Sequence, residues 1–268
     1  MAPLDRPRAA DGYGRAVDVS TGQLLVVGAA GLAAGAINAV VGSGTLITYP
    51  VLLGAGVPPV TANGTNAVGL AVGGVSSAVA YREELRPRAR VLLPLALLAM
   101  VGGAIGAWLV VSLPEKVFEA VVPWLIVGAV VLVAVQPVIT KRVQTRVHHL
   151  TQRAKDLPFL VALLGVYGGY FGAGQGVMYM AVLGLRYDDD VQQANAAKNL
   201  LGSLANVAAA VVFIATGAVV WPYVVALWIG SVVGGYYGGR VARRIPRSVL
   251  RGIVIAVGLY AAIYLVVT

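Results

Sequence analysis

Apolar residues fill long stretches of this chain that contain no Asp, Glu, Lys or Arg. There are six of them: Val19 to Tyr81, Val91 to Pro114, Ala120 to Thr140, Leu157 to Leu185, Asn199 to Gly239 and Gly252 to Thr268. A helix that crosses a bilayer needs about 20 apolar residues, with a range of roughly 17 to 25. The pattern therefore predicts an all-α polytopic membrane protein with these stretches as its membrane segments.

Glycine and proline break the first stretch into pieces. The breaks lie at Gly42, Gly44, Pro50, Gly54, Gly56, Pro58 and Pro59. They leave a middle piece, Leu46 to Ala55, that is too short to cross. We therefore expect the first element, Gln23 to Ala55, to enter the membrane and return, and Leu157 to Leu185 to do the same. A first helix that crosses the bilayer is the alternative.

A nearly constant offset relates the two halves of the chain. The matched pairs are Gly35/Gly165, Gly42/Gly172, Gly44/Gly174, Tyr49/Tyr179 and Gly54/Gly184 at an offset of 130, then Asn63/Asn195, Asn66/Lys198, Gly102/Gly234 and Gly106/Gly238 at 132. Chance similarity of glycine-rich segments is the alternative, but agreement over about eighty residues indicates an internal duplication. The predicted organisation is a polar tail at 1–21, repeat one at 22–140, a basic connection at 141–156 and repeat two at 157–268.

Basic residues predict that the two repeats face opposite sides of the membrane. Three connections, Arg82 to Arg90, Lys141 to Lys155 and Arg240 to Arg251, hold 14 of the 20 Lys and Arg residues. Because Lys and Arg near span ends favour the cytoplasm, all three should be cytoplasmic. The first connection follows the second element of repeat one, whereas the last follows the third element of repeat two. This mismatch requires inverted repeats, each with a re-entrant first element plus three membrane-spanning helices.

Composition and charge narrow the classes of function. Hydrophobic residues make up 59% of the chain and charged residues only 12%, against roughly a quarter charged in soluble domains, which excludes a soluble enzyme. The formal charge of +9 does not indicate nucleic acid binding, because the basic residues cluster between the apolar stretches. The chain has no cysteine, no acidic residue inside a span, and one histidine pair, His148 and His149, in the basic connection. We expect no catalytic residue, no metal site and no cofactor.

Two glycine-rich breaks are the first candidates for a binding site. Gly42 to Thr45 and Gly172 to Gln175 each precede a short apolar segment, and irregular backbone at membrane depth is tolerated only inside protein or beside a water-filled cavity. The free N–H groups and the positive dipole at such a helix start attract anions. Close helix packing is the alternative role for glycine. The expected backbone donors to an anion are the N–H groups of Gly44, Thr45, Gly174 and Gln175.

Polar residues on the helices that follow complete the candidate site. Asn195, Asn199, Ser203 and Asn206 share one helical face, and Lys198 lies beside them among alanines and leucines. A lysine near the midplane costs roughly 2.5 to 3.5 kcal/mol and needs a partner or water, and snorkelling to the surface is the alternative. For the repeat-one residues, N-capping is the alternative. The predicted substrate-binding residues are Gly42, Ser43, Gly44, Thr45, Asn63, Thr65, Asn66, Gly172, Gly174, Gln175, Asn195, Lys198, Asn199 and Asn206.

Two linked signatures resemble the TauE/SafE family of membrane permeases, the group of sulfite and organosulfonate exporters. The signatures are Gly42 to Leu52 followed by Ala62 to Asn66, and Gly172 to Val177 followed by Ala194 to Asn199 and Ser203 to Asn206. The resemblance extends from Leu24 to the carboxyl terminus. It implies a polytopic permease that moves small sulfur-containing anions. The family motif often continues its glycine run where this chain has Thr45 and Gln175.

Together these features predict a secondary transporter for a small anion such as sulfite, a sulfonate or a related sulfur oxyanion, bound near the midplane between two half-helices. A passive anion channel is the nearest alternative, and a membrane scaffold or receptor is the third. The expected partners are the anion and the lipid bilayer, while a coupling ion, proton or sodium, and a homo-oligomer are left open. The expected location is a prokaryotic inner (plasma) membrane with the three basic connections in the cytoplasm.

Overall fold

The computed structural model describes residues 19–40, 42–145, 155–187, 191–235 and 247–267, and in these ranges the backbone forms helices and no strands. The predicted all-α architecture is therefore confirmed. His148, His149 and the arginines at 240–246 lie outside the described residues, as does most of the predicted polar tail. The helices are α1 (Thr21–Val40), α2 (Thr45–Gly54), α3 (Pro59–Ala80), α4 (Arg82–Leu85), η1 (Arg86–Arg88), α5 (Ala89–Ser112), α6 (Glu115–Thr145), α7 (Leu157–Tyr170), α8 (Gln175–Arg186), α9 (Val191–Ala215), α10 (Trp221–Val233) and α12 (Arg247–Val267).

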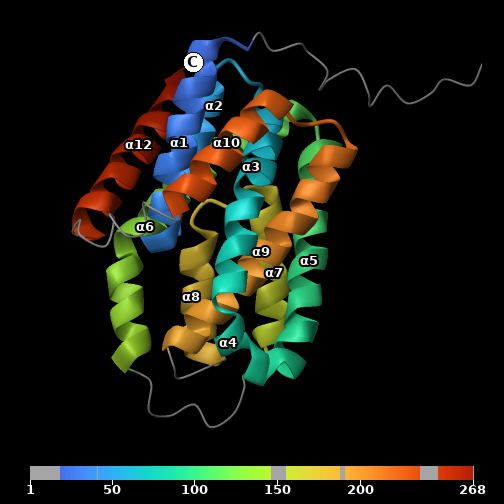
Figure 1. Cartoon of the computed structure of the whole chain (residues 1–268), viewed down its shortest axis with the longest axis vertical. Helices are drawn as coiled ribbons and strands as arrows, with labels where there is room; N and C mark the ends of the chain where they lie inside the picture. Colours follow the sequence, from blue (N-terminus) through green and yellow to red (C-terminus); the bar gives the residue numbers. More distant parts are fainter. Residues whose placement is uncertain (1–18, 41, 146–154, 188–190, 236–246, 268) are drawn as a thin grey trace, which may run out of the picture.

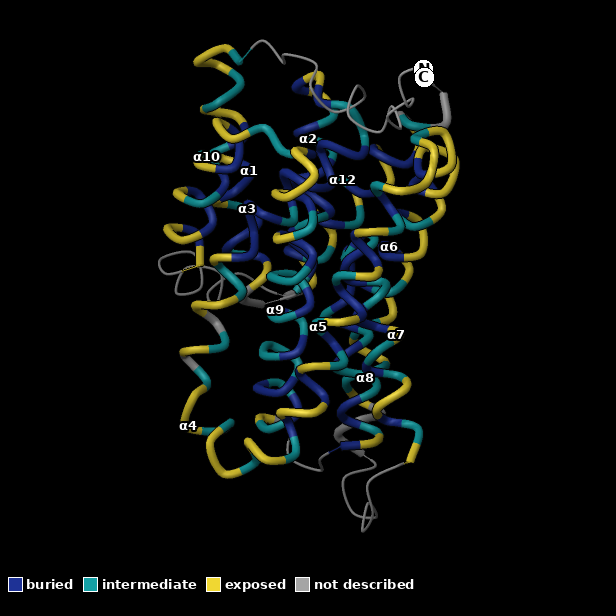
Figure 2. Tube along the Cα trace, turned by 90° about the vertical axis from the view of Figure 1, so that its right-hand side faces the viewer, coloured by how far each residue is buried: buried dark blue, intermediate teal, exposed yellow. Residues whose placement is uncertain are grey.

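These helices have the length and the outward-facing apolar side chains of a membrane protein. Large apolar side chains point away from the protein, and Leu25, Trp124 and Phe159 are each at least 70% exposed. Figure 2 shows exposed and buried residues alternating along the helices, as expected when one face of a helix packs and the other meets lipid. The chain is an integral membrane protein. Four described segments are long and apolar enough to cross a bilayer: Thr21–Asn38, Arg82–Ser112, Glu115–Lys141 and Gln192–Ala215.

Two pairs of helices form hairpins that turn back inside the protein. α1 and α2 are tied at their open end, where Gln23 Nε2 donates to the carbonyl oxygen of Ala55 at 3.1 Å. α7 and α8 are tied in the same way by an ion pair between Arg186 and Asp156, 3.0 Å apart. In Figure 1 the first hairpin opens toward the top of the molecule and the second toward the bottom, near α4. Each hairpin therefore returns to the end of the molecule at which it begins.

Each hairpin packs closely against a helix from the other half of the chain. α1 lies along α10, and α7 lies along α5. Glycine permits both approaches: a Cβ atom on Gly35 would lie 2.9 Å from Ser231 Cα, and one on Gly165 would lie 3.1 Å from Ala99 Cα. We call α1, α2, α3 and α10 the first bundle, and α5, α7, α8 and α9 the second bundle. The bundles meet where α3 packs on α9, and α6 packs on α12 beside them.

These two close approaches obey the offset found in the sequence. Gly165 follows Gly35 by 130 residues, and Ser231 follows Ala99 by 132. The same helix contact is thus made twice, once by each half of the chain. The duplication stays a prediction with which this correspondence agrees. Gly35 and Gly165 both serve close helix packing, which is the alternative role for Gly35. The boundaries of the repeats and their opposite orientation in the membrane stay predictions.

Candidate functional site

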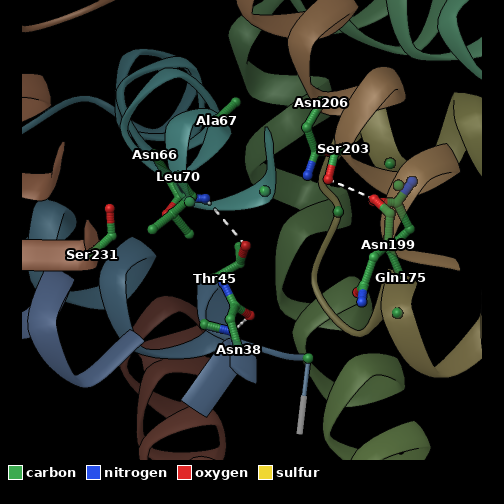
Figure 3. A pocket seen from close by; sticks show the side chains of 18 of the residues that line it. Asn38, Thr45, Asn66, Ala67, Leu70, Gln175, Asn199, Ser203, Asn206 and Ser231 are labelled. Carbon is green, nitrogen blue, oxygen red and sulfur yellow. Dashed lines mark hydrogen bonds between the residues drawn. The ribbon is translucent and has the colours of Figure 1, made fainter. Parts of the chain in front are cut away.

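A cavity of about 550 Å³ lies where the tips of the two hairpins meet. Its lining comes from both bundles, and no described residue of α5, α6 or α12 contributes to it. In Figure 3 the labelled side chains of α1, α2 and α3 lie on one side, and those of α8 and α9 lie on the other. The site is therefore an interface between the two bundles. Its polar side chains include Asn38, Thr45, Asn63 and Asn66 from the first bundle and Gln175, Lys198, Asn199 and Asn206 from the second.

Ten of the predicted site residues line this cavity and four do not. Ser43 is buried, and its hydroxyl has no hydrogen-bond partner among the described residues. Thr65 Oγ1 accepts from the N–H of Val220 at 2.9 Å, and Asn195 Nδ2 donates to the hydroxyl of Tyr81 at 2.9 Å. The fourth is Gly174, whose φ is +72°. The ten lining residues are Gly42, Gly44, Thr45, Asn63, Asn66, Gly172, Gln175, Lys198, Asn199 and Asn206.

Both hairpin tips turn at a glycine. Gly42 and Gly172 have φ values of +81° and +75°, a backbone region that other residues rarely adopt. Their N–H groups donate to carbonyl oxygens five residues earlier, at 3.2 and 3.1 Å, and so close the carboxyl ends of α1 and α7. The tips also touch, because a Cβ atom on Gly176 would lie 3.2 Å from the carbonyl oxygen of Gly42. The two breaks seen in the sequence are thus brought together at the cavity.

Two of the four predicted backbone donors are already paired inside the hairpins. The Gly44 N–H donates to Asn38 Oδ1 at 2.6 Å. The Gln175 N–H donates to the carbonyl oxygen of Gly172 at 3.2 Å. An anion at these helix starts would therefore have to share or displace an existing partner.

Asn66 is locked in place by the first turn of α2. The hydroxyl of Thr48 donates to Asn66 Oδ1, and Asn66 Nδ2 donates to Thr45 Oγ1 at 3.3 Å. Thr48 is fully buried behind this contact. These bonds hold the start of the half-helix α2 against α3. N-capping does not explain Asn66, because α3 already begins at Pro59.

Asn63 joins the two halves of the chain across the cavity. Its Nδ2 atom donates to the backbone carbonyl of Tyr170 at 2.9 Å. Tyr170 is the last residue of α7, so the bond connects α3 of the first bundle to the tip of the second hairpin. Asn63 is almost completely buried, with 2% of its surface exposed. It therefore serves the architecture of the site as well as its polarity.

Lys198 is the position that matches Asn66 in the second half of the chain, but its surroundings differ. No ion pair or hydrogen bond joins its side chain to another described residue, and the same is true of Asn199 and Asn206. All three line the cavity, and none of the described lining residues is Asp or Glu. The position of Lys198 in the cavity lining favours a role in the site over the snorkelling alternative, and that role stays a prediction. The cavity thus combines one cation with two amides that are available to a ligand.

The sequence patterns do not single out Asn38, Ser76 or Ser231, which also line the cavity. Asn38 is the most informative of them, because it is the last polar residue of α1 before the break at Gly42. An isolated amide in an otherwise apolar segment is the signal that identifies it. Ser203, on the polar face of α9, lines the cavity too and donates to the carbonyl oxygen of Asn199 in its own helix.

Comparisons with known proteins agree with this architecture. A family model described as "Sulfite exporter TauE/SafE" matches residues 27–265. "Probable membrane transporter protein ORF9" of a Sinorhizobium species is 30% identical over 206 residues, which are 75% of this chain and 76% of that protein. A "Probable membrane transporter protein" of Haemophilus influenzae is 27% identical over 220 residues, 81% of this chain and 84% of that protein.

A third relative is "Probable membrane transporter protein YfcA" of Escherichia coli, which is 27% identical over 205 residues, 75% of this chain and 74% of that protein. No solved structure matches the chain. The family match covers the first hairpin from Val27 onward, the whole second hairpin, the cavity between them and the helices that enclose it. The protein is a membrane transporter and belongs to the TauE/SafE family.

Proposed function

We propose that the protein is a secondary transporter of a small anion, a sulfur oxyanion such as sulfite or a sulfonate, which binds in the cavity between the hairpin tips. The charge of the cavity carries this proposal. Of the described residues that line it, Lys198 alone is ionisable. A lysine at membrane depth needs a partner of opposite charge or water. In the absence of a lining carboxylate, the substrate itself is the natural counter-charge.

The neighbours of Lys198 suit an oxyanion. Asn199 and Asn206, whose amides can donate hydrogen bonds, line the same cavity. Charge-assisted bonds from a lysine to an oxyanion are roughly twice as strong as neutral ones. The glycine tips at Gly42 and Gly172 let a ligand approach the backbone closely. We assign Lys198, Asn199 and Asn206 as the main side-chain ligands, and the remaining predicted residues as the frame around them.

The division of the cavity between two bundles supports alternating access over passive conduction. Inside each bundle the helices pack at glycine, as Gly35 does at Ser231 and Gly165 does at Ala99, and close glycine contacts occur between the bundles too, as Gly74 does at Ser203. The bundles meet each other mainly at α3 and α9. We propose that the bundles move relative to one another and open the cavity to one side of the membrane at a time.

Our proposed membrane arrangement is a prokaryotic plasma membrane with the three basic connections in the cytoplasm. Arg82 to Arg88, in α4 and η1, lies at the same end of the molecule as the open end of the second hairpin (Figure 1), and the Arg88 guanidinium lies 5.8 Å from the ring centroid of Tyr187, directly after α8. This placement supports a common side for the first two basic connections. The remaining basic connection, Arg240 to Arg251, lies mostly outside the described residues, so its side of the membrane is a proposal from charge alone.

Flux into proteoliposomes tests the proposal and separates it from its alternatives. The purified protein is reconstituted, and sulfite uptake is followed with and without an imposed proton or sodium gradient. A secondary transporter accumulates sulfite against its gradient when the coupling ion is supplied. A channel only equilibrates sulfite, and a scaffold or receptor moves none. Either of the last two results contradicts secondary transport.

A further inference from the structure

The start of the half-helix α2 is covered by the side-chain amide of Asn38, whereas the start of α8 has no such cover from a described residue. Its Oδ1 atom accepts a hydrogen bond from the Gly44 N–H at 2.6 Å, and its side chain is exposed in the cavity. Figure 3 shows the amide at the base of α2, below Thr45. A carboxamide oxygen on this N–H takes the place that an oxygen of a bound anion would take. The amide also covers the backbone, since a Cβ atom on Gly44 would lie 2.7 Å from Asn38 Nδ2.

The second hairpin has no such tethered amide at the matched position. The residue 130 positions after Asn38 is Gly168. The space beside Gly168 is filled by the amide of Gln175, which turns into α7 and donates to the carbonyl oxygen of Leu164 at 3.2 Å. The atoms nearest to a Cβ atom on Gly174, the residue at the start of α8, belong to Ala129 and not to an amide.

The helices that follow the two half-helices, α3 and α9, differ in the same way at one pair of matched positions: the polar side chain is paired on α3 and unpaired on α9. Asn66 is held by Thr45 and Thr48, whereas Lys198, at the matched position, has no partner among the described residues. The polar groups of the first half are therefore occupied by internal bonds. On α9 the side chains of Lys198, Asn199 and Asn206 have no partner among the described residues, and Lys198 is the only ionisable residue of the described cavity lining.

We propose that Asn38 is a tethered competitor for the substrate anion. The anion rests on Lys198, Asn199 and Asn206, and it reaches the start of α2 only by displacing the Asn38 amide from the Gly44 N–H. The Asn38 side chain thereby weakens binding and limits how firmly an anion bridges the two bundles. This inference rests on the anion site of the proposed function and adds a residue that sets its affinity.

Binding to two variants at Asn38 tests the competition. Sulfite, sulfate and taurine are titrated separately into the purified protein in detergent and followed by calorimetry. Asn38→Ala frees the Gly44 N–H, so we expect binding to become roughly three- to tenfold tighter, the value of one hydrogen bond. Asn38→Asp keeps an oxygen on the same N–H but adds a negative charge, so we expect binding at least about tenfold weaker.

Gln23→Ala is the matched control. It removes an amide from the same hairpin, at the open end where Gln23 bonds to Ala55 and outside the cavity lining. Its affinity should equal that of the parent. If Asn38 only caps α2, Asn38→Ala lowers the melting temperature without tightening binding, while the carboxylate of Asn38→Asp still weakens binding because it repels the anion. That pattern overturns the competition and leaves the anion site intact.

A different set of binding results would show that the anion site itself does not exist. If none of the three anions binds the parent or any variant, the proposed function fails and the competition fails with it. If the parent binds and Lys198→Met does not, the site stands. Asn38→Ala then decides the competition, because the charge of Asn38→Asp weakens binding whether or not the amide competes.

Discussion

Gly165 of α7 lies directly against the backbone of Ala99 in α5, so close that a Cβ atom on Gly165 would be 2.6 Å from the Ala99 carbonyl oxygen. Cβ atoms do not approach backbone oxygens so closely, and one helix must shift when alanine replaces this glycine. Forcing extra atoms into a packed interface costs typically about 1–3 kcal/mol. We expect Gly165→Ala to lower the melting temperature of the purified protein accordingly.

Gly128→Ala is the control for this prediction. Gly128 lies in α6, and nothing lies within 4 Å of a Cβ atom built there. Because alanine is a better helix former than glycine by up to about 1 kcal/mol, its melting temperature should be unchanged or higher. Equal melting temperatures for Gly165→Ala and the parent would contradict the close packing of α5 and α7.

Lys198→Met should weaken anion binding strongly and leave folding intact. Methionine fits the apolar neighbours of Lys198 and removes the charge. A hydrogen bond to a charged group contributes about 1.5–3 kcal/mol, so sulfite affinity should fall roughly ten- to hundredfold. Lys198→Arg should retain part of the affinity. Lys116→Met, an exposed lysine at the start of α6, is the control and should bind as the parent does. Unchanged affinity in Lys198→Met would remove Lys198 from the site.

Thr48→Val should loosen the start of α2. Thr48 is fully buried, and its hydroxyl donates to Asn66. Valine has the same shape but leaves Asn66 Oδ1 without this donor, at a cost of about 1–3 kcal/mol. The melting temperature should fall. In the background of Asn66→Ala the same substitution should cost much less, and strictly additive losses in this double-mutant cycle would show that the two side chains are not coupled.

Much of the fold could be predicted from the spacing of charges and glycines. Charge-free stretches identify membrane helices because a bilayer core excludes unpaired charge. Gly42 and Gly172 mark the hairpin tips because the turn needs a positive φ. It could not be predicted that each bundle contains helices from both halves of the chain. A sequence shows which glycines a helix carries but not which neighbouring helix they contact, because that depends on how the two repeats pack together.

Some residues of the candidate site could also be predicted from the sequence, and others could not. Asn199 and Asn206 could be found because helical spacing places them on one face, and Lys198 because it is a lone charge among apolar residues. Asn195 shares that face but lies one turn earlier, where Tyr81 accepts its hydrogen bond. Asn38 could not be assigned from spacing, because its bond to Gly44 exists only once the chain has turned at Gly42. Loop geometry, not periodicity, decides that contact.

Single cysteines test the proposed orientation, since the chain has none of its own. Ser112, Thr216, Ser248 and Lys155 are exposed in the structure. In intact cells, cysteines at Ser112 and Thr216 should react with an impermeant maleimide. Cysteines at Lys155 and Ser248 should react only after the membrane is opened, because they flank basic connections. Labelling of the Ser248 position from outside would refute the inverted arrangement.

Two adjacent glycines of α3 offer the sharpest test of movement between the bundles. A Cβ atom on Gly74 would lie 3.3 Å from Ser203 Cβ on α9, and one on Gly73 would lie 3.9 Å from Ser231 Cβ on α10. Both distances are close to the roughly 3.5–4.5 Å that a disulfide requires. The Gly74 pair joins the two bundles, whereas the Gly73 pair lies within the first bundle.

Each double-cysteine variant is reconstituted and assayed before and after oxidation, so that it serves as its own reference. Oxidation of the Gly74→Cys/Ser203→Cys variant should stop sulfite uptake, and a reducing agent should restore it, because the disulfide fixes one bundle against the other. Oxidation of the Gly73→Cys/Ser231→Cys variant should leave uptake at the level of its own reduced form, since that bond crosses no moving interface. Full transport through the oxidised Gly74 variant would show that α3 and α9 stay together during the cycle, and the moving parts would then have to be sought elsewhere.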